Sequence, residues 1–353
     1  KKCFQKKNLM KNNILFFSID RLGDYLIRSN VIYNITKHYK NSDIICSNIN
    51  YKLIKKQSFF RHVHLFDNSK KNKEKIRFIW NFFFKKYNTI ISFDGKNISN
   101  ILLLLLRADF KFVFIYKKYG YINNLKTKLY CSFLNIFNIK FEILNSRKLI
   151  ELSSSDHYPT KYRSLKKYYN NINDETYHIE NFELDHNVNI KEEFIIIHLD
   201  EKFNDIIDID KNFTESLNTL SLTCNKKIIL TSYKNNRDYY KNLDIKKIPF
   251  KKIEEINLYK EKIFILENVP LMEFYYLIKK SALNFSCHAG FFVHASLYNK
   301  KKTIDLISSN EEKWLNSWVT KDDNYQIMYK SNLNKKFSIL DILIKLNNEI
   351  KKL

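Results

Sequence analysis

The sequence predicts a two-domain α/β fold built on open, doubly wound parallel sheets. Its 353 residues are enough for two domains, each with its own core. Short, continuous apolar runs alternate with stretches of helical periodicity, which is the pattern of buried parallel strands joined by crossover helices. An apolar fraction of 44% and an aromatic fraction of 15% supply enough surface for two such cores.

The first domain is predicted over residues 1–165, as four strand–helix units followed by a fifth strand. The expected elements, strand before helix, are 14–19 with 24–39, 44–47 with 51–57, 62–66 with 75–86 and 89–93 with 97–107, followed by the strand 110–116. Right-handed crossovers would place these helices on both faces of the sheet. Ligands are expected at the carboxyl ends of the strands, as in other sheets of this type.

The second domain is predicted over residues 166–335, after a Ser-, Asn- and acid-rich linker at about 146–190. Its expected strands are 194–199, 227–232, 263–267, 283–287 and 303–307, and its expected helices are 213–223, 271–280 and 291–297. Apolar residues at helical spacing predict a closing helix over 336–353. We expect the two α/β halves to face each other across a cleft.

The net charge of +24 comes from lysines that are scattered between apolar runs. This pattern favours a solubilising role for the charge, so nucleic acid is not the expected partner. A basic surface of this kind still attracts phosphorylated substrates and anionic lipid headgroups. A peripheral contact with the membrane surface is therefore compatible with the composition.

The cysteines indicate a reducing compartment. They are odd in number, widely spaced and free of any C-x-x-C pair, which argues against a disulfide framework or a zinc site: Cys3, Cys46, Cys131, Cys224 and Cys287. The longest leucine-rich run, 101–106, is far shorter than the roughly 20 apolar residues of a membrane span. We expect a cytoplasmic protein, with any membrane contact at the inner face of the cytoplasmic membrane.

The first candidate site is the loop Asp20-Arg21-Leu22-Gly23-Asp24, which follows the first predicted strand. Gly23 would permit a tight turn into the helix, and Asp24 would lie in the first helical turn, facing the cleft. A carboxylate at this strand end, beside Arg21, could take a proton from a hydroxyl that enters the cleft. Alternatively, Asp24 is a helix N-terminal residue that the helix dipole stabilises. The loop does not match G-x-G-x-x-G, so no dinucleotide fingerprint is present.

The second candidate site is the segment Ser286-Cys287-His288-Ala289-Gly290, which follows a buried strand and opens a helix. The free N–H groups and dipole of that helix would receive a diphosphate. Two of the four glycines, Gly23 and Gly290, fall in the two candidate loops. In a chain so poor in glycine, this placement predicts turns that tolerate little else.

The reactive side chains near this second loop have plain structural alternatives. His294, on the following helix, fits a core histidine as well as a ligand contact. Cys287, His288 and His294 lack a fourth ligand and any standard spacing, so no metal site is predicted from them. A buried structural thiol is a commoner role for Cys287 than a nucleophile.

The two segments together resemble those of the heptosyltransferase-like glycosyltransferases, family 9. In that family the first loop reads R-x-G-D before an apolar helix, which Arg21-Leu22-Gly23-Asp24 reproduces. The loop near the C-terminus reads D-[TS]-G-x-x-H-[LI]-A, which this chain matches in part. Cys287 or His288 stands where the family has Asp, and three residues instead of two separate Gly290 from His294.

The resemblance implies a fold and a role for each domain. The fold is the GT-B arrangement of two Rossmann-like domains with parallel sheets facing a central cleft, and a C-terminal helix that packs back across the domains. The N-terminal domain would receive the acceptor, and the C-terminal domain would hold the nucleotide sugar. By the same resemblance Asp24 is the general base, while Lys202 neutralises the leaving diphosphate unless it is simply a surface lysine. Thr231 and Ser232 are further donor-side candidates.

The resemblance also implies a reaction. It is the inverting, metal-independent transfer of a sugar from a nucleotide-diphosphate sugar, with ADP-heptose as one candidate donor, to a lipopolysaccharide-type or other surface glycan. The acceptor would be lipid-linked or an oligosaccharide, and no cofactor besides the donor substrate is expected. Two alternatives stay open, namely the same fold with a different nucleotide sugar and a non-catalytic member that binds glycan or an anionic polymer.

Overall fold

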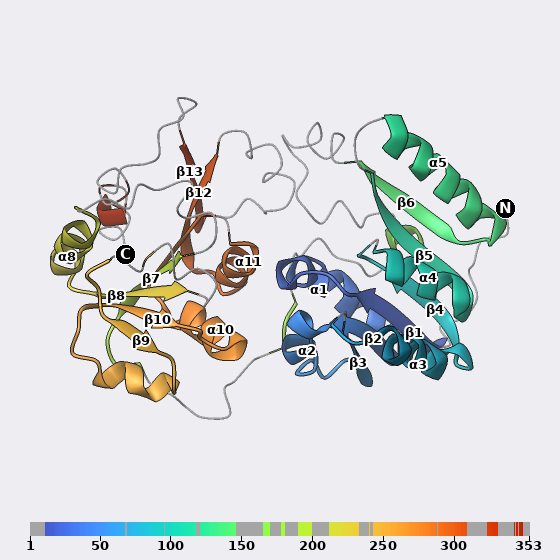
Figure 1. Ribbon diagram of the computed structural model, residues 1–353, viewed down its shortest axis with the longest axis horizontal. Helices are drawn as coiled ribbons and strands as arrows, with labels where there is room; N and C mark the ends of the chain where they lie inside the picture. Colours follow the sequence, from blue (N-terminus) through green and yellow to red (C-terminus); the bar gives the residue numbers. More distant parts are fainter. Residues whose placement is uncertain are drawn as a thin grey trace. The chain divides into compact units, whose positions relative to one another are not determined.

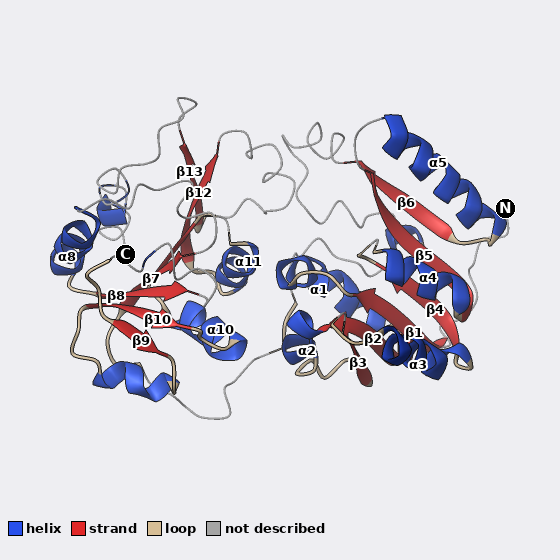
Figure 2. Ribbon diagram, viewed as in Figure 1, coloured by secondary structure: helices blue, strands red, loops and turns tan. Residues whose placement is uncertain are grey.

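The chain forms two compact units, Lys1–Glu180 and Asn181–Leu353, in a computed structural model. The structure describes residues 11–67, 69–94, 96–117, 121–145, 165–169, 178–180, 190–199, 212–232, 240, 243–287, 289–308, 323–330, 342, 344 and 346–348. The division between the units falls within the predicted linker. Strands run through the middle of each unit and helices flank them (Figures 1 and 2).

The first unit contains a six-stranded sheet in the order β3-β2-β1-β4-β5-β6, with every neighbouring pair parallel. Its strands are β1 (Lys11–Ser18), β2 (Tyr39–Ser47), β3 (His62–Phe66), β4 (Lys86–Ser92), β5 (Arg107–Lys117) and β6 (Lys140–Asn145). Its helices are α1 (Leu22–Thr36), α2 (Asn48–Ile54), α3 (Asn72–Phe83), α4 (Asn97–Leu105) and α5 (Tyr121–Ile136). This order reverses between β1 and β4, and ligands bind at such a switch point in doubly wound sheets.

The central strand β1 is buried on both faces, as its continuous apolar run predicts. On one face, Leu15 and Phe17 belong to an apolar cluster that α3, α4 and α5 complete with Phe82, Leu102 and Leu134 respectively. On the other face, Phe16 stacks on Phe93 with ring centroids 6.2 Å apart. The parallel sheet is therefore the middle layer of a three-layer unit.

Residues on the C-terminal side of β6 return to pack on the first unit. The Tyr169 and Tyr39 hydroxyls lie 2.8 Å apart, and the His178 ring stacks on Tyr33 with a centroid separation of 3.4 Å. The carboxylate of Glu180 accepts hydrogen bonds from the backbone and hydroxyl of Ser58. These contacts extend the first compact unit to Glu180.

The second unit contains a seven-stranded sheet in the order β13-β12-β11-β7-β8-β10-β9, again with parallel neighbours. Its strands are β7 (Phe194–Leu199), β8 (Lys227–Ser232), β9 (Lys247–Pro249), β10 (Ile263–Glu267), β11 (Leu283–Ser286), β12 (Lys302–Ser308) and β13 (Tyr325–Lys330). Its helices are α8 (Asn212–Cys224), α10 (Leu271–Lys280) and α11 (Gly290–Tyr298), with a 3-10 helix over Ile253–Leu258. Among the described residues, no helix is both long and apolar enough to cross a membrane.

The end of the chain contributes to the core of the second unit. Ile342 and Leu346 are buried in the same apolar cluster as Ile197 of β7 and Leu230 of β8. Ile342 and Leu346 are both helical, in agreement with the predicted closing helix. The packing of that helix across both domains stays a prediction.

The structure also contains elements that the sequence analysis did not assign, among them α5, β6, β9 and β13. Several predicted helix boundaries are wrong. The helices expected over 51–57 and 75–86 lie three residues earlier, at Asn48–Ile54 and Asn72–Phe83. The helix expected over 24–39 begins at Leu22 and ends at Thr36. Tyr39 instead opens β2, where it pairs with Lys11 of β1. The apolar periodicity of the sequence continues past the end of α1, but backbone pairing in the sheet determines where the helix ends.

Candidate active site

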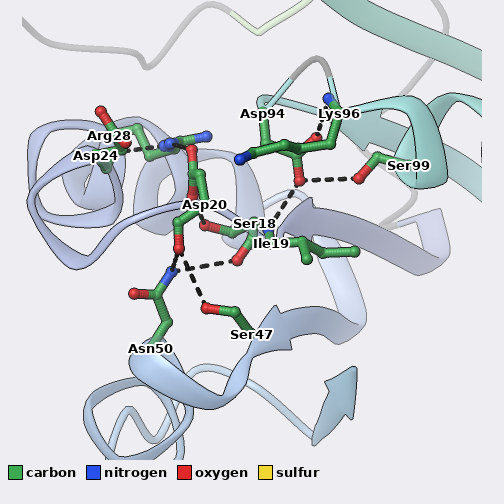
Figure 3. Close-up of polar contacts among 10 residues, drawn as sticks. All are labelled: Ser18, Ile19, Asp20, Asp24, Arg28, Ser47, Asn50, Asp94, Lys96 and Ser99. Carbon is green, nitrogen blue, oxygen red and sulfur yellow. Dashed lines mark hydrogen bonds and ion pairs between the residues drawn. The ribbon is translucent and has the colours of Figure 1, made fainter. Parts of the chain in front are cut away.

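A buried ion pair lies at the loop between β1 and α1. The Asp20 carboxylate pairs with the guanidinium of Arg28, in the second turn of α1, and the two residues are 9% and 1% exposed (Figure 3). The Ser18 hydroxyl donates a hydrogen bond of 3.2 Å to Asp20 Oδ1. Because each charge is partnered, both can be held away from water at the strand end.

The junction of β2 and α2 supports the same residue from its backbone side. The Ser47 hydroxyl and the Asn50 amide donate to the Asp20 carbonyl at 3.1 and 3.0 Å. Figure 3 shows both side chains beneath Asp20. The Asp20 carboxylate and carbonyl are therefore both fixed by neighbouring elements.

Asp94, which follows β4, connects the ends of β1 and β4. Its carboxylate accepts hydrogen bonds from the Ile19 N–H at 2.7 Å, the Ser99 hydroxyl at 2.9 Å and the Lys96 N–H at 3.0 Å. Asp94 was not among the residues predicted from the sequence. The available signal was Gly95, another of the four glycines, which stands three residues after the end of β4 and next to Asp94 in the sequence.

Asp24 lies in the first turn of α1 and is half-buried. Its backbone carbonyl accepts a hydrogen bond of 2.6 Å from Arg28 Nε, so one arginine contacts both the Asp20 side chain and the Asp24 backbone. Arg21 is the exposed N-cap residue of α1, and Gly23 is buried within the first turn. The structure thus brings the four predicted loop residues together at the carboxyl end of β1, while their roles stay predictions.

In the second unit, a polar row crosses four adjacent strands near their carboxyl ends. In strand register, Thr231 of β8 is level with His198 of β7, His198 with Ser286 of β11, and Ser286 with Asp305 of β12. The buried Asp305 carboxylate accepts hydrogen bonds from Ser286 at 3.1 Å and from the Tyr325 hydroxyl at 2.8 Å. Thr231 and Ser286 were predicted from the sequence as donor-side residues, whereas His198 and Asp305 were not.

His198 is a buried, neutral histidine in this row. Its Nδ1 lies 3.0 Å from the Thr231 hydroxyl, and its ring lies against Phe274 and Phe292, with centroids 5.0 and 5.4 Å away. Burial lowers the pKa of His198 to about 4, because the charged imidazolium would lose its hydration. At neutral pH this side chain provides a polar contact without a positive charge.

The remaining residues predicted on the donor side lie in different surroundings. Cys287 is buried in the apolar cluster of the second unit, and Ser232 and His294 are buried, at the end of β8 and in α11. Gly290 is the first residue of α11, where an added Cβ would meet no atom within 4 Å. The prediction that this position tolerates little besides glycine is therefore wrong on steric grounds. Lys202 and His288 lie outside the described residues.

The buried ion pair allows a stability prediction. Arg28→Met leaves the Asp20 carboxylate buried without its partner and should lower the free energy of unfolding by about 3–5 kcal/mol in urea titrations. The double variant Asp20→Asn/Arg28→Met should lose less than the sum of the single losses, because neither charge is left alone. Lys70→Met is the control, since it breaks the exposed Lys70–Glu74 pair of 3.3 Å and should change stability by under about 1 kcal/mol. Equal losses in Arg28→Met and Lys70→Met would contradict this account.

The low pKa of His198 predicts a pH dependence. Between pH 6.5 and 4 the unfolded chain protonates this histidine while the folded chain does not, so stability falls as the pH drops through this window. Between pH 7 and 5 the wild type should lose about 2 kcal/mol more than His198→Gln in urea titrations. As a direct check, the His198 ring resonance should show no protonation at pH 5.5. An ordinary titration near pH 6.5 would rule the assignment out.

No protein-family model matches the sequence, and no curated protein matches it. Solved structures do match in fold. A family 9 glycosyl transferase from Veillonella parvula has a TM-score of 0.66 at 10% identity, covering 98% of this chain and 100% of that one. Escherichia coli heptosyltransferase WaaC with ADP has a TM-score of 0.63 at 11% identity, covering 95% and 99%.

The ADP-heptose lipopolysaccharide heptosyltransferase II of E. coli has a TM-score of 0.64 at 9% identity, covering 96% of this chain and 99% of that one. These likenesses extend over nearly the whole chain. They confirm the predicted fold class, with two Rossmann-like parallel sheets of the GT-B type. The chain therefore has the fold of the heptosyltransferase-like glycosyltransferases of family 9.

Proposed function

We propose that the chain is a glycosyltransferase that moves a sugar from a nucleotide-diphosphate sugar to a surface-glycan acceptor. The observation that carries the proposal is Asp24, a half-buried carboxylate in the first turn of α1, at the switch point of the first sheet. The fold supports it, since two of the similar structures are named as complexes with ADP or an ADP-sugar analogue. ADP-heptose is accordingly the first donor to test.

In the proposed reaction Asp24 acts as general base. Its carboxylate takes the proton of the acceptor hydroxyl as that oxygen attacks the anomeric carbon of the donor. The bond between the anomeric carbon and the diphosphate oxygen breaks on the opposite side, so the sugar configuration inverts. Arg28 and Asp20 would act as positioning residues, because their contacts fix the backbone on both sides of the α1 N-terminus.

The leaving diphosphate is proposed to bind at the N-terminus of α11 in the second unit. The N-cap residue of this helix, Ala289, provides no side-chain cap, so the first backbone N–H groups are available for an anion. The open space at Gly290 would let a phosphate approach that backbone. Lys202 is the proposed source of positive charge, because the neighbouring His198 is neutral at pH 7.

Asp24→Asn tests the base directly. Loss of a general base should reduce turnover by about 10²–10⁴-fold, while donor affinity stays nearly unchanged because the nucleotide is proposed to bind in the other unit. The measurement is sugar transfer together with thermal shift across ADP-, UDP-, GDP- and CMP-sugars.

The control for this variant is Asp67→Asn, which removes a partly exposed carboxylate from the same unit and should leave turnover unchanged. Wild-type turnover in Asp24→Asn would refute the assigned role. Stabilisation by a donor other than an ADP-sugar would replace heptose by that sugar, and the absence of any stabilisation would favour the non-catalytic alternative.

A lipid-linked acceptor would require the enzyme to work at a membrane surface, and the first unit has a suitable apolar face. The helices α3, α4 and α5 pack on one face of the sheet and leave large apolar side chains exposed on their outer sides. These are Ile76, Trp80 and Phe84 on and just after α3, Ile101 and Leu105 on α4, and Leu125, Leu129, Phe133, Ile136 and Phe137 on and just after α5. We call this set the outer apolar face.

Basic side chains accompany the outer apolar face. Arg77, Lys85 and Lys86 are exposed near Trp80, and Lys126 and Lys128 are exposed on α5. Apolar and aromatic groups flanked by Lys and Arg are the combination by which peripheral proteins bind anionic membranes. We propose that this face contacts the membrane that carries the acceptor.

The double variant Trp80→Glu/Phe84→Glu should weaken binding to vesicles of phosphatidylglycerol and phosphatidylcholine at least tenfold, measured by co-sedimentation. The reason is that two aromatic side chains can no longer enter the interface and two negative charges face anionic lipid. The control is Leu222→Glu/Leu258→Glu in the second unit, where the two leucines are 80% and 74% exposed. Equal loss in both double variants, or no vesicle binding by the wild type, would contradict the proposed face.

A further inference from the structure

A second cluster of chemically reactive side chains lies in the first unit, away from the candidate active site. Asp43 is in the middle of β2, and His62 and His64 are on the edge strand β3. Ser47 ends β2 and contacts the Asp20 loop. Asp43 lies four residues before Ser47, which is about 13 Å of extended strand. The cluster therefore requires an explanation separate from the proposed transfer.

Strand register brings these three side chains together. Asp43 is level with His62, and His64 is two residues further along β3, so all three project from one face of the sheet. The His62 Nδ1 atom lies 3.2 Å from Asp43 Oδ1, and His64 Nε2 lies 3.9 Å from Asp43 Oδ2. One ligand atom from each of the three residues can be chosen so that all lie within 4.8 Å of one another.

The spacing fits a single transition-metal ion. With zinc–ligand bonds of about 2.0–2.2 Å, two ligand atoms on one tetrahedral zinc lie about 3.3–3.6 Å apart. The His62–Asp43 distance of 3.2 Å is close to this range. The widest separation in the set is up to 4.8 Å, so side-chain rotations that bring these atoms about 1 Å closer would complete the site. Two imidazoles and one carboxylate suit zinc, whereas magnesium and calcium prefer oxygen ligands throughout.

Two further contacts point to a ligand between these groups. His64 Nε2 is buried and has no hydrogen-bond partner among the described residues, although it faces the carboxylate. The Tyr87 hydroxyl donates a hydrogen bond of 3.3 Å to Asp43 Oδ2, as the outer partners of metal-binding carboxylates do. Phe82 of α3 packs edge-on against the His64 ring, with centroids 4.7 Å apart, and holds its orientation.

Access to the cluster is open on one side. The His62 side chain is 50% exposed, while those of His64 and Asp43 are 22% and 13% exposed. An ion could thus enter from solvent past His62 and be held by the two more buried residues. Three protein ligands leave the fourth tetrahedral position to water.

We propose that Asp43, His62 and His64 bind one Zn²⁺ ion, which links the edge strand β3 to β2. The proposal is independent of the glycosyl transfer proposed above. Because the ion binds only the folded arrangement of two strands, it stabilises the folded chain, and this stabilisation rises with the logarithm of the zinc concentration once that concentration exceeds the dissociation constant.

The test is zinc titration of the full chain, followed by calorimetry and thermal shift. The wild type should bind one zinc ion at this cluster with a rise in Tm, and X-ray absorption should show nitrogen and oxygen neighbours without sulfur. His62→Asn and Asp43→Asn should each weaken binding at least tenfold. His62 is half-exposed, so its variant should keep the wild-type circular dichroism spectrum and Tm without zinc.

Two matched controls keep the wild-type cluster. His38→Gln removes another partly exposed histidine of the first unit, and Asp109→Asn removes an exposed carboxylate near the start of β5. Both should bind zinc as the wild type does. The proposal fails if the wild type binds no zinc, if the bound zinc has sulfur neighbours alone, or if His62→Asn and Asp43→Asn bind it as tightly as the controls.

Discussion

The buried ion pair between Asp20 and Arg28 determines the shape of the candidate active site in the first unit. Two charges removed from water are tolerated only where each is partnered, and here the strand end and the helix that follows it each supply one charge. Arg28 also holds the Asp24 carbonyl, while Ser47 and Asn50 hold the Asp20 carbonyl. The turn between β1 and α1 is thereby restrained from three elements, and Asp24 follows it in the first turn of α1.

The second unit uses a different arrangement at the corresponding strand ends. The groups of its polar row are either uncharged or hydrogen-bonded to one another. His198 is uncharged beside Thr231, and the Asp305 carboxylate accepts hydrogen bonds from Ser286 and Tyr325. Such a row can be buried under α10 and α11 without an unpaired positive charge. Positive potential for a diphosphate must then come from the α11 N-terminus and from lysine, which is why the transfer proposal assigns that role to Lys202 and not to a histidine.

Local sequence was sufficient for most strands, though not for β6, β9 and β13, and for the Asp20–Asp24 loop, because continuous apolar runs and a glycine after a strand are local signals. Arg28, Asp94 and Asp305 were missed since their importance lies in partners from other elements, as when Asp94 binds the Ile19 N–H. Asp43 and His62 were missed for the same reason, because only the register of β2 against β3 places them side by side. Gly290 was misread, because scarcity of glycine does not reveal whether a side chain would fit. The helix α5 was not assigned in a chain where lysine and asparagine dilute turn signals.

Helix α3 connects the two surface proposals of the first unit. Its inner side places Phe78 and Phe82 against the sheet, and Phe82 contacts the His64 ring of the proposed zinc site. Its outer side carries Trp80, which stacks on Phe83 with a centroid separation of 5.7 Å. Membrane binding orders the side chains of an amphipathic helix, and this ordering costs conformational entropy. The cost is smaller when the helix already rests on a rigid support. An ion that joins β2 to β3 directly beneath Phe82 would fix that support, so zinc and membrane binding would act on the same edge of the sheet.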